Sequence, residues 1–309
     1  MRVLNIGSLN IDYVYDVERF VSRGETISSA DRSTFPGGKG LNQSLALGRA
    51  GVEVAHAGLI GAEGIFLREL LAESGVDVGL VRTMDGCPTG HAVIQRVPDG
   101  DNCIILFGGA NHCVDEAFVD EAIGRFMSGD WLLLQNETSC LAHAIEAAKQ
   151  HGMRVAVNPS PADDGLTACP LELVDCFVLN EGEAARLSGR SGGVDEMLSA
   201  MCERFPDASV VLTMGEGGSA CAEGGVVTTQ MAFRVDAVDT TAAGDTFTGY
   251  YLAECARGAS ASEALRVASA AAAIAVSRVG AALSIPARAE VEKFLAGRHA
   301  PDLHAAAKL

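Results

Sequence analysis

Short apolar runs alternate along the chain with segments in which apolar residues recur three and four positions apart. The runs cover residues 3–6, 52–57, 131–135, 154–157, 176–179 and 209–213. Near-continuous apolar runs of this length are typical of parallel strands that are covered on both faces. Residues 41–49 and 66–72 have helical spacing, and Gly51 and Gly75 follow them where helices commonly end. The alternation predicts an α/β fold with a doubly wound, mostly parallel, Rossmann-like sheet.

Two segments depart from this alternation. Residues 13–34 and 90–109 show strand-like patterning around turn signals such as Pro98-Asp-Gly-Asp101. We expect them to pair as a small separate β-sheet that serves as a lid. No Pro- or Ser-rich linker and no internal repeat interrupts the chain, so we expect a single domain over residues 1–309.

Composition and charge narrow the function. Of the 309 residues, 48% are hydrophobic and 20% are charged, as in a folded globular protein. Forty acidic residues against 23 Lys and Arg give a net charge of -17, which repels nucleic-acid phosphates and anionic lipids. We therefore expect neither nucleic acid nor membrane as a partner. A nucleotide is still permitted, because surface charge is screened over about 8 Å and a local site can reverse the sign.

The cysteines and the apolar segments predict the environment of the protein. Nine Cys include no CxxC pair, and Cys103, Cys176 and Cys202 sit among apolar neighbours, so we expect reduced, buried thiols. The longest apolar run, residues 267–276, is about half of the ~20 residues that a membrane span needs. Polar residues stand near the N-terminus where a signal peptide needs its apolar stretch. We expect a soluble cytoplasmic protein.

Residues 238–247, Val-Asp-Thr-Thr-Ala-Ala-Gly-Asp-Thr-Phe, are the most informative segment. Small residues stand just before a helical stretch over residues 248–257, where unpaired N–H groups and the helix dipole form an anion site. Asp245 would lie beside the bound phosphate as an exposed carboxylate, kept anionic by backbone donors. The alternative is that Asp245 is an ordinary helix cap.

A second glycine cluster, Pro36-Gly-Gly-Lys-Gly-Leu-Asn42, also precedes a helix. It is neither a Walker A loop nor GxGxxG. Its glycines would let the backbone approach a ligand, with Lys39 and Asn42 as donors. A turn with a solvated Lys is the alternative, but Asn10 and Asp12 follow the first strand, where α/β folds place ligand contacts.

Three further segments follow predicted strands. Residues 213–218, Thr-Met-Gly-Glu-Gly-Gly, can wrap a phosphate or a base, although such turns are common. Asn180-Glu-Gly-Glu183 offers oxygens to Mg²⁺ or its waters, or is simply an acidic helix start. Glu137 either enters a ligand site or lies exposed in a loop.

Together these segments resemble the ribokinase-like, or phosphofructokinase-B, family of carbohydrate kinases. The resemblance runs over residues 5–294; residues 37–42 look like the family's first signature and residues 239–247 like its second. Within the family, the similarity is greatest to ribokinases themselves, through residues 7–12, 24–26, 109–111 and 158–161. It implies phosphorylation of a small sugar, first of all ribose, with ATP, Mg²⁺ and K⁺, by a homodimer that pairs through its lids.

The resemblance also implies a role for individual residues. Asp245 would be the catalytic base, with Ala242, Ala243 and Gly244 as the anion hole. The sugar-binding positions would be Asn10, Asp12, Gly38, Lys39, Asn42, Glu137 and Asp245. The nucleotide positions would be Asn180, Thr213, Met214, Gly215, Glu216, Gly217, Gly218, Gly244 and Ser269, and Glu183 would reach Mg²⁺ through water. The K⁺ loop would comprise Asp239, Thr241, Ala275, Arg278, Gly280 and Ser284.

Other readings stay open at this point. A kinase for deoxyribose, fructose or a nucleoside would use the same phosphate machinery. A catalytically silent sugar sensor on the same fold is a further alternative, against which the intact Asp245 and its small neighbours argue. Ser269 stands where relatives often carry His or Asn against the adenine, which puts that contact in doubt.

Overall fold

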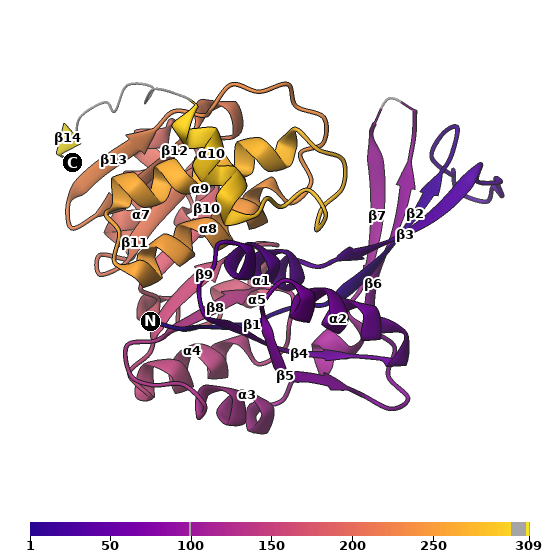
Figure 1. The fold of residues 1–309 in the computed structure, drawn as a ribbon, viewed down its shortest axis with the longest axis horizontal. Helices are drawn as coiled ribbons and strands as arrows, with labels where there is room; N and C mark the ends of the chain where they lie inside the picture. The colour runs from indigo at the N-terminus through magenta and orange to yellow at the C-terminus, as the bar shows by residue number, and fades with distance from the viewer. Residues whose placement is uncertain (99, 298–306, 309) are drawn as a thin grey trace.

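The central sheet is doubly wound and mostly parallel. A computed structural model describes residues 1–98, 100–297 and 307–308 (Figure 1). Within them, ten strands form one sheet in the order β14-β13-β12-β11-β10-β9-β8-β1-β4-β5. The pairs from β11 to β5 are parallel, and those from β11 outward to β14 are antiparallel. The strands are β1 (Val3–Ile6), β4 (Val54–Ile60), β5 (Asp77–Thr83), β8 (Trp131–Gln135), β9 (Arg154–Asn158), β10 (Cys176–Asn180), β11 (Ser209–Thr213), β12 (Ser219–Glu223), β13 (Val226–Gln230) and β14 (Ala307–Lys308).

Successive strand residues enter two different apolar clusters, one on each face of this sheet. Val3 and Trp131 belong to one cluster, while Leu4 and Leu132 belong to the other. This explains the unbroken apolar runs at β1 and β8, because both faces of these strands are buried. Helices α1 (Lys39–Arg49), α2 (Ile65–Glu73), α8 (Ala243–Arg257), α9 (Ala261–Val276) and α10 (Arg288–Ala296) supply the first cluster. Helices α3 (Glu116–Ile123), α4 (Leu141–Gln150), α6 (Glu181–Ser188) and α7 (Val194–Arg204) supply the second. The predicted fold class is confirmed.

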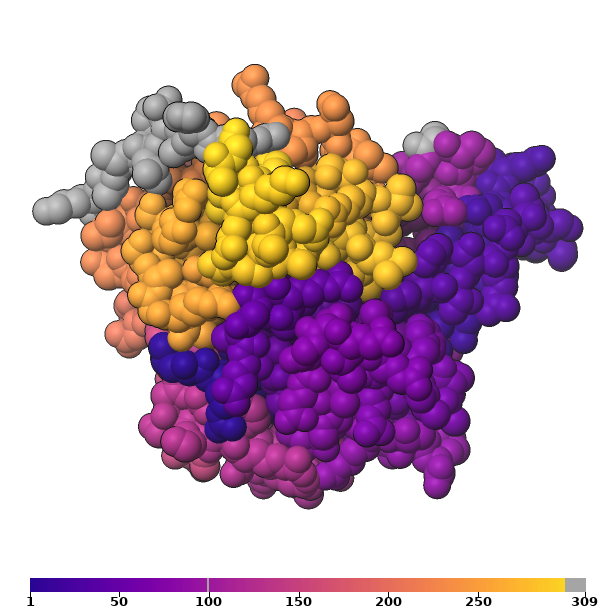
Figure 2. Space-filling model, viewed as in Figure 1, coloured from indigo at the N-terminus to yellow at the C-terminus, as the bar shows by residue number. Residues whose placement is uncertain are grey.

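The small sheet is a separate four-stranded layer in the order β3-β2-β6-β7. It comprises β2 (Asn10–Asp16), β3 (Asp31–Gly37), β6 (Gly90–Arg96) and β7 (Asn102–Phe107). Figures 1 and 2 show it projecting from the body of the molecule. The predicted pairing of the two irregular segments is confirmed; Asp99, in the predicted turn, lies outside the described residues.

The prediction that Cys103 is buried is wrong. All six residues of β7 are exposed, because this strand is the edge of the small sheet and no described helix covers it. Cys176 is buried as expected, and Cys202 is partly buried. Nowhere in the described part of the chain is there a helix long and apolar enough to span a bilayer.

Candidate active site

Asp245 lies in the first turn of α8, which begins five residues earlier than the sequence pattern indicated. The helix is preceded by Ala242, whose φ of 59° is left-handed and rare for a residue with a side chain. The N–H of Ala243 donates to the carbonyl of Thr240 at 3.2 Å, so it is already engaged. The N–H groups of Gly244 and Asp245 donate to no acceptor in the described part of the chain. They leave an anion site at the positive end of the helix dipole.

The carboxylate of Asp245 is buried, which corrects the expectation that it is exposed. Only 8% of the residue is accessible. Its donors are side-chain amides: Asn42 Nδ2 lies 2.9 Å from Oδ2 and Gln43 Nε2 lies 2.9 Å from Oδ1. The alternative of a helix cap is wrong as well, because the cap position is Ala242. Neutral amides hold the carboxylate without neutralising it.

Close packing of α1 against α8 brings these amides to Asp245. A β-carbon at Gly249 in α8 would lie 2.4 Å from the Ala46 β-carbon and 2.9 Å from the Gln43 carbonyl oxygen in α1. Glycine at this position therefore permits the two helices to approach. The two helices must lie this close because the side-chain amides of Asn42 and Gln43 have to reach Asp245 from the α1 backbone.

The residues expected to bind the sugar converge from three parts of the chain. Asn10 and Asp12 share one face of β2, where side chains two apart point the same way. Lys39 begins α1, and its N–H donates to Glu137 Oε2 at 3.1 Å. Ser8 Oγ also donates to this Glu137 oxygen. The alternative of an exposed loop Glu at position 137 is therefore wrong.

Glycines make room for this convergence. A β-carbon at Gly37 would lie 2.2 Å from Oδ2 of Asp12, so the Asp12 carboxylate occupies the space of the missing side chain. Gly38 precedes α1 with a φ of 95°, a conformation that favours glycine. These glycines therefore leave space beside the backbone, and at Gly37 the Asp12 carboxylate fills it.

The charges in this cluster shift one another. Burial raises the pKa of Asp12 to about 6, and the nearby Glu137 carboxylate adds to the shift. Burial also raises the pKa of Glu137, although Ser8 and Lys39 act against it. Burial acts to lower the pKa of Lys39, but the carboxylates of Asp245 and Glu137 outweigh it and raise that pKa. Lys39 is the cation that these carboxylates share.

A cavity of about 260 Å³ lies between Lys39 and the ends of the central strands, and its wall does not include the other sugar candidates Asn10, Asp12, Gly38, Asn42 and Glu137. Lys39 and Asp245 line it together with Gly244, Asn180 and Thr213. Ala242, Ala243 and Glu183 also contribute to its wall. The catalytic candidate therefore faces one space that reaches from the glycine cluster to β10 and β11.

Asn180 and Glu183 cap α6 reciprocally. The Asn180 side chain accepts from Glu183 N at 2.9 Å, and Glu183 Oε2 accepts from Asn180 N at 3.0 Å. The helix-start alternative is thus realised, and both side chains still border the cavity. No three His, Cys, Asp or Glu side chains gather as a metal cage within the described residues.

The remaining nucleotide candidates, residues 214–218 and Ser269, are not part of the cavity wall. After Thr213, residues 214–218 make a tight loop in which Met214 N donates to the Gly218 carbonyl at 2.9 Å. Ser269, buried in α9, places its Oγ 3.4 Å from Oγ of Ser219, which directly follows this loop. The fold brings Ser269 to the loop despite the distance in sequence.

The candidate K⁺ residues form two loops tied together by Asp239. One Asp239 oxygen accepts from Thr241 N at 2.9 Å and from Thr241 Oγ1 at 2.6 Å, and the other accepts from Gly280 N at 2.9 Å. Burial acts to raise the pKa of Asp239, but these hydrogen bonds lower it. Arg278 N donates to the Ala275 carbonyl at 3.0 Å, and Ser284 is fully buried.

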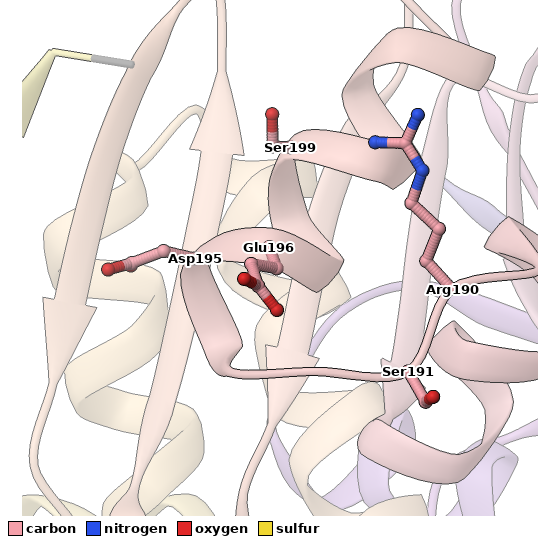
Figure 3. Close-up of a pocket in the computed structure, with 5 residues that line it drawn as sticks. All are labelled: Arg190, Ser191, Asp195, Glu196 and Ser199. Carbon is pink, nitrogen blue, oxygen red and sulfur yellow. The ribbon is translucent and has the colours of Figure 1, made fainter.

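A second hollow, of about 640 Å³, lies beside α7 (Figure 3), and Asp245 is not among its lining residues. Figure 3 shows its labelled side chains, Arg190, Ser191, Asp195, Glu196 and Ser199, pointing in different directions. Arg190 is already paired with Glu203 at 3.1 Å. The size of this hollow alone does not make it a binding site, because its labelled polar side chains do not converge on a common point.

Sequence reasoning missed three residues that hold the site in place. Gln43 donates to Asp245, Asn158 accepts from Gln43 at 3.0 Å, and Asn111 Nδ2 donates to Asn10 Oδ1 at 2.7 Å. The available signal was a run of polar residues, Asn42-Gln-Ser44, inside a helix that is buried from residue 40 to residue 47. Buried polar side chains in such a helix need partners.

Comparison with known proteins agrees with this geometry. A ribokinase of Haemophilus influenzae is 36% identical over 297 residues, covering 94% of this chain and 97% of the relative. The solved ribokinase of Thermotoga maritima matches with a TM-score of 0.85 and 32% identity, over 95% of this chain and 99% of that one. The solved Arabidopsis thaliana ribokinase complexed with ribose and ATP matches with a TM-score of 0.83 and 32% identity, over 95% and 98%. Residues 2–288 match the family described as pfkB family carbohydrate kinase, so the chain belongs to this family of carbohydrate kinases.

Proposed function

We propose that the chain catalyses the ATP-dependent phosphorylation of D-ribose to D-ribose 5-phosphate. One observation carries the proposal: Asp245 borders a cavity that extends from Lys39 to Asn180 and Thr213. A sugar hydroxyl and a nucleotide phosphate can meet there beside a carboxylate. The choice of ribose and ATP is supported by the relative whose name gives both ligands.

In the proposed reaction, Asp245 accepts the proton of the attacking sugar hydroxyl. The hydroxyl oxygen bonds to the γ-phosphorus while the bond from that phosphorus to the bridging oxygen breaks, and ADP leaves with the electron pair. The anion hole would lie at Ala242, Ala243 and Gly244, although the N–H of Ala243 already donates to the Thr240 carbonyl. The unengaged N–H groups of Gly244 and Asp245 would stabilise charge on the transferring group. This division of labour suits phosphoryl transfer, which needs chiefly positioning and charge neutralisation.

The sugar would be held by hydrogen bonds to its hydroxyls. Asn42 Oδ1 is buried without a partner in the described part of the chain, so it is an acceptor that a hydroxyl can satisfy. Asp12 and Glu137 supply further acceptors, and Lys39 supplies donors. The proposed sugar-binding set is Asn10, Asp12, Gly38, Lys39, Asn42, Glu137 and Asp245.

ATP would extend from the start of α8 towards β10, β11 and α9. The proposed nucleotide positions are Asn180, Thr213, Met214, Gly215, Glu216, Gly217, Gly218, Gly244 and Ser269. Glu183, with its carboxylate at the cavity wall, would hold Mg²⁺ through water, in keeping with oxygen ligands and retained waters. When bound, Mg²⁺ would neutralise charge on the phosphates.

A K⁺ ion would be held by the two loops that Asp239 joins. The carbonyls of Thr241, Arg278 and Gly280 accept no hydrogen bond from a described residue, so these oxygens are free for a hard cation. The Ala275 carbonyl and Ser284 complete the proposed set. The ion would support the loop that leads into α8.

We also propose that the chain is one kinase domain in which residues 13–34 and 90–109 of the small sheet act as a lid, and that two lids pair in a homodimer. The edge strand β7 exposes Ile104, Ile105, Leu106 and Phe107. An exposed apolar edge strand is a template for pairing with another chain. A second copy of this chain would cover it.

The decisive experiment is a coupled ADP-release screen over pentoses, hexoses and nucleosides with ATP and Mg²⁺. We expect the highest kcat/KM for D-ribose. A higher value for deoxyribose, fructose or a nucleoside would overturn the ribose assignment and leave the kinase in place. Turnover with none of them, together with sugar binding by calorimetry, would favour the silent sensor.

A further inference from the structure

Gln43 is one of two amides that hold the Asp245 carboxylate. It donates from Nε2 to Oδ1 at 2.9 Å, while Asn42 donates to Oδ2. Gln43 is fully buried and does not line the cavity. It therefore touches Asp245 and not the substrates.

The Gln43 amide has only one permitted orientation. Its Nε2 also lies 3.0 Å from Asn158 Oδ1, and its Oε1 accepts from Gln135 Nε2 at 2.8 Å. The Asn158 amide is fixed in turn, because its Nδ2 donates to the Val178 carbonyl at 2.8 Å. Gln135 Nε2 donates as well to Asn5 Oδ1 at 3.0 Å. Reversing the Gln43 amide would set a donor against a donor and an acceptor against acceptors.

This arrangement fixes the plane of the Asp245 carboxylate. One hydrogen bond to each oxygen, from neighbouring residues of one helix, prevents rotation about the Asp245 side chain. The lone pairs left over then have a set direction towards the cavity. A general base must be within hydrogen-bonding reach of the proton it accepts, and misplacement by about 1 Å can cost ~100-fold in rate.

We propose that Gln43 is a positioning residue that aligns Asp245 with the sugar hydroxyl. The inference rests on the proposed function, because it takes Asp245 to be the base. Gln43 keeps the carboxylate oriented through a neutral hydrogen-bond donor. The chain from Gln135 and Asn158 serves to hold Gln43 in that role.

The test compares three substitutions at one position with a neighbouring control. Gln43→Met keeps the volume and removes the donor; we expect kcat to fall ten- to a hundredfold with KM for ATP within twofold. Gln43→Asn keeps the amide, but the shorter side chain holds it farther from Asp245, so we expect a smaller loss of kcat. Gln43→Glu places a second carboxylate beside Asp245, so the two share a proton and the acidic limb of the kcat–pH profile moves up by a unit or more.

Ser44→Ala is the matched control. Ser44 is the next residue of α1 and is equally buried. Its Oγ accepts a hydrogen bond from Asn5 Nδ2 at 2.7 Å, lies 2.8 Å from His56 Nδ1, and makes no hydrogen bond to Asp245. It should lower the melting temperature as the Gln43 variants do, yet keep kcat and the pH profile. If Gln43→Met or Gln43→Asn folds and retains wild-type kcat and pH profile, the inference is wrong. If Asp245→Asn is itself active, the proposed base is wrong instead; if it is inactive while Gln43→Met is unimpaired, only the role of Gln43 fails.

Discussion

Asn42 Nδ2 and Asp245 Oδ2 lie 2.9 Å apart although 203 positions separate them in the sequence. The contact joins the two segments that the family signatures occupy, one at the start of α1 and one at the start of α8. Because Asn42 also keeps an unpartnered buried oxygen, it can contact the sugar and the proposed base at once. If the proposed roles of Asn42 and Asp245 hold, this one side chain would couple sugar binding to catalysis.

The first prediction concerns Asp245→Asn. Loss of a positioned acid–base group typically costs on the order of a hundredfold or more, so we expect kcat to fall by at least that factor. The variant should fold and bind ATP, because Asn is the same size and can still accept one of the two amide hydrogen bonds. Initial rates, thermal melting and ATP titration measure the three quantities. Asp207→Asn is the control, because Asp207 is exposed and does not line the cavity. Near wild-type kcat in Asp245→Asn would refute the assignment of Asp245 as the base.

The sugar preference gives a second prediction. D-Ribose should be phosphorylated with a higher kcat/KM than 2-deoxyribose, because a site built to bond a hydroxyl leaves buried polar groups unpaired at about 1–3 kcal/mol apiece when that hydroxyl is missing. Asp12→Ala should raise KM for ribose steeply, spare KM for ATP and narrow the preference. Asp16→Ala, on the same strand and paired at the surface with Arg96, should change none of these values. Equal effects of the two substitutions would remove Asp12 from the sugar site.

Potassium dependence is the third prediction. Rates should rise in K⁺ and respond poorly to Na⁺ or to a large organic cation, because the two loops would offer oxygen ligands suited to a hard cation. Asp239→Ala should abolish the activation, since it releases both Thr241 and Gly280. Asp236→Ala, exposed three residues earlier, should retain it. Identical rates in K⁺ and tetramethylammonium would contradict the proposal.

The dimer can be tested at β7. Ile105→Lys puts a charge in the middle of the exposed apolar strand, and we expect it to convert a dimer to a monomer in light scattering coupled to gel filtration. Met127→Lys is a matched control, because Met127 and Ile105 are both 67% exposed. A wild-type monomer, or a dimer that survives Ile105→Lys, would exclude pairing through this edge.

The fold could be predicted from sequence where burial leaves a simple pattern. The apolar runs at β1, β8 and β11 coincide with the strands because both faces of those strands are covered. The small sheet followed from alternation and turn signals. Cys103 was misjudged because its apolar neighbours in β7 are themselves exposed, a result of the edge position that local sequence does not encode.

The site was predictable only in part. The glycine clusters and Asp245 are visible as motifs, and their roles came from a family resemblance. Asn42 was expected as a donor in the site, but the role of Gln43 was not predicted, because the contact between Gln43 and Asp245 depends on the packing of α8 against α1 at Gly249. The burial of Asp245 depends on the same long-range packing.

The location of the protein in the cytoplasm stays a prediction.

The last prediction follows from the pKa of Asp12. In the free protein this pKa is about 6, above the ordinary 3.8, because burial and Glu137 disfavour the charge. The protonated form is favoured in the folded state, so this contribution to stability is complete below pH 3.8 and is lost as the pH rises through 6. Ionised Asp12 should therefore cost ~1–2 kcal/mol at pH 7 after allowance for solvent screening. Asp12→Asn should raise the melting temperature of the sugar-free protein at pH 7 and leave it little changed at pH 4. The pH dependence of ribose binding has the opposite sign, because the ionised carboxylate accepts hydrogen bonds from hydroxyls. Wild-type KM for ribose should rise about tenfold from pH 7 to pH 5, as the ionised fraction of Asp12 falls. Glu137 and Lys39 face the same space, so the Asp12→Asn variant, measured over the same range, isolates the part due to Asp12. A wild-type KM that is flat from pH 5 to pH 7, or a variant with the full wild-type slope, would show that Asp12 does not bind the sugar as an anion.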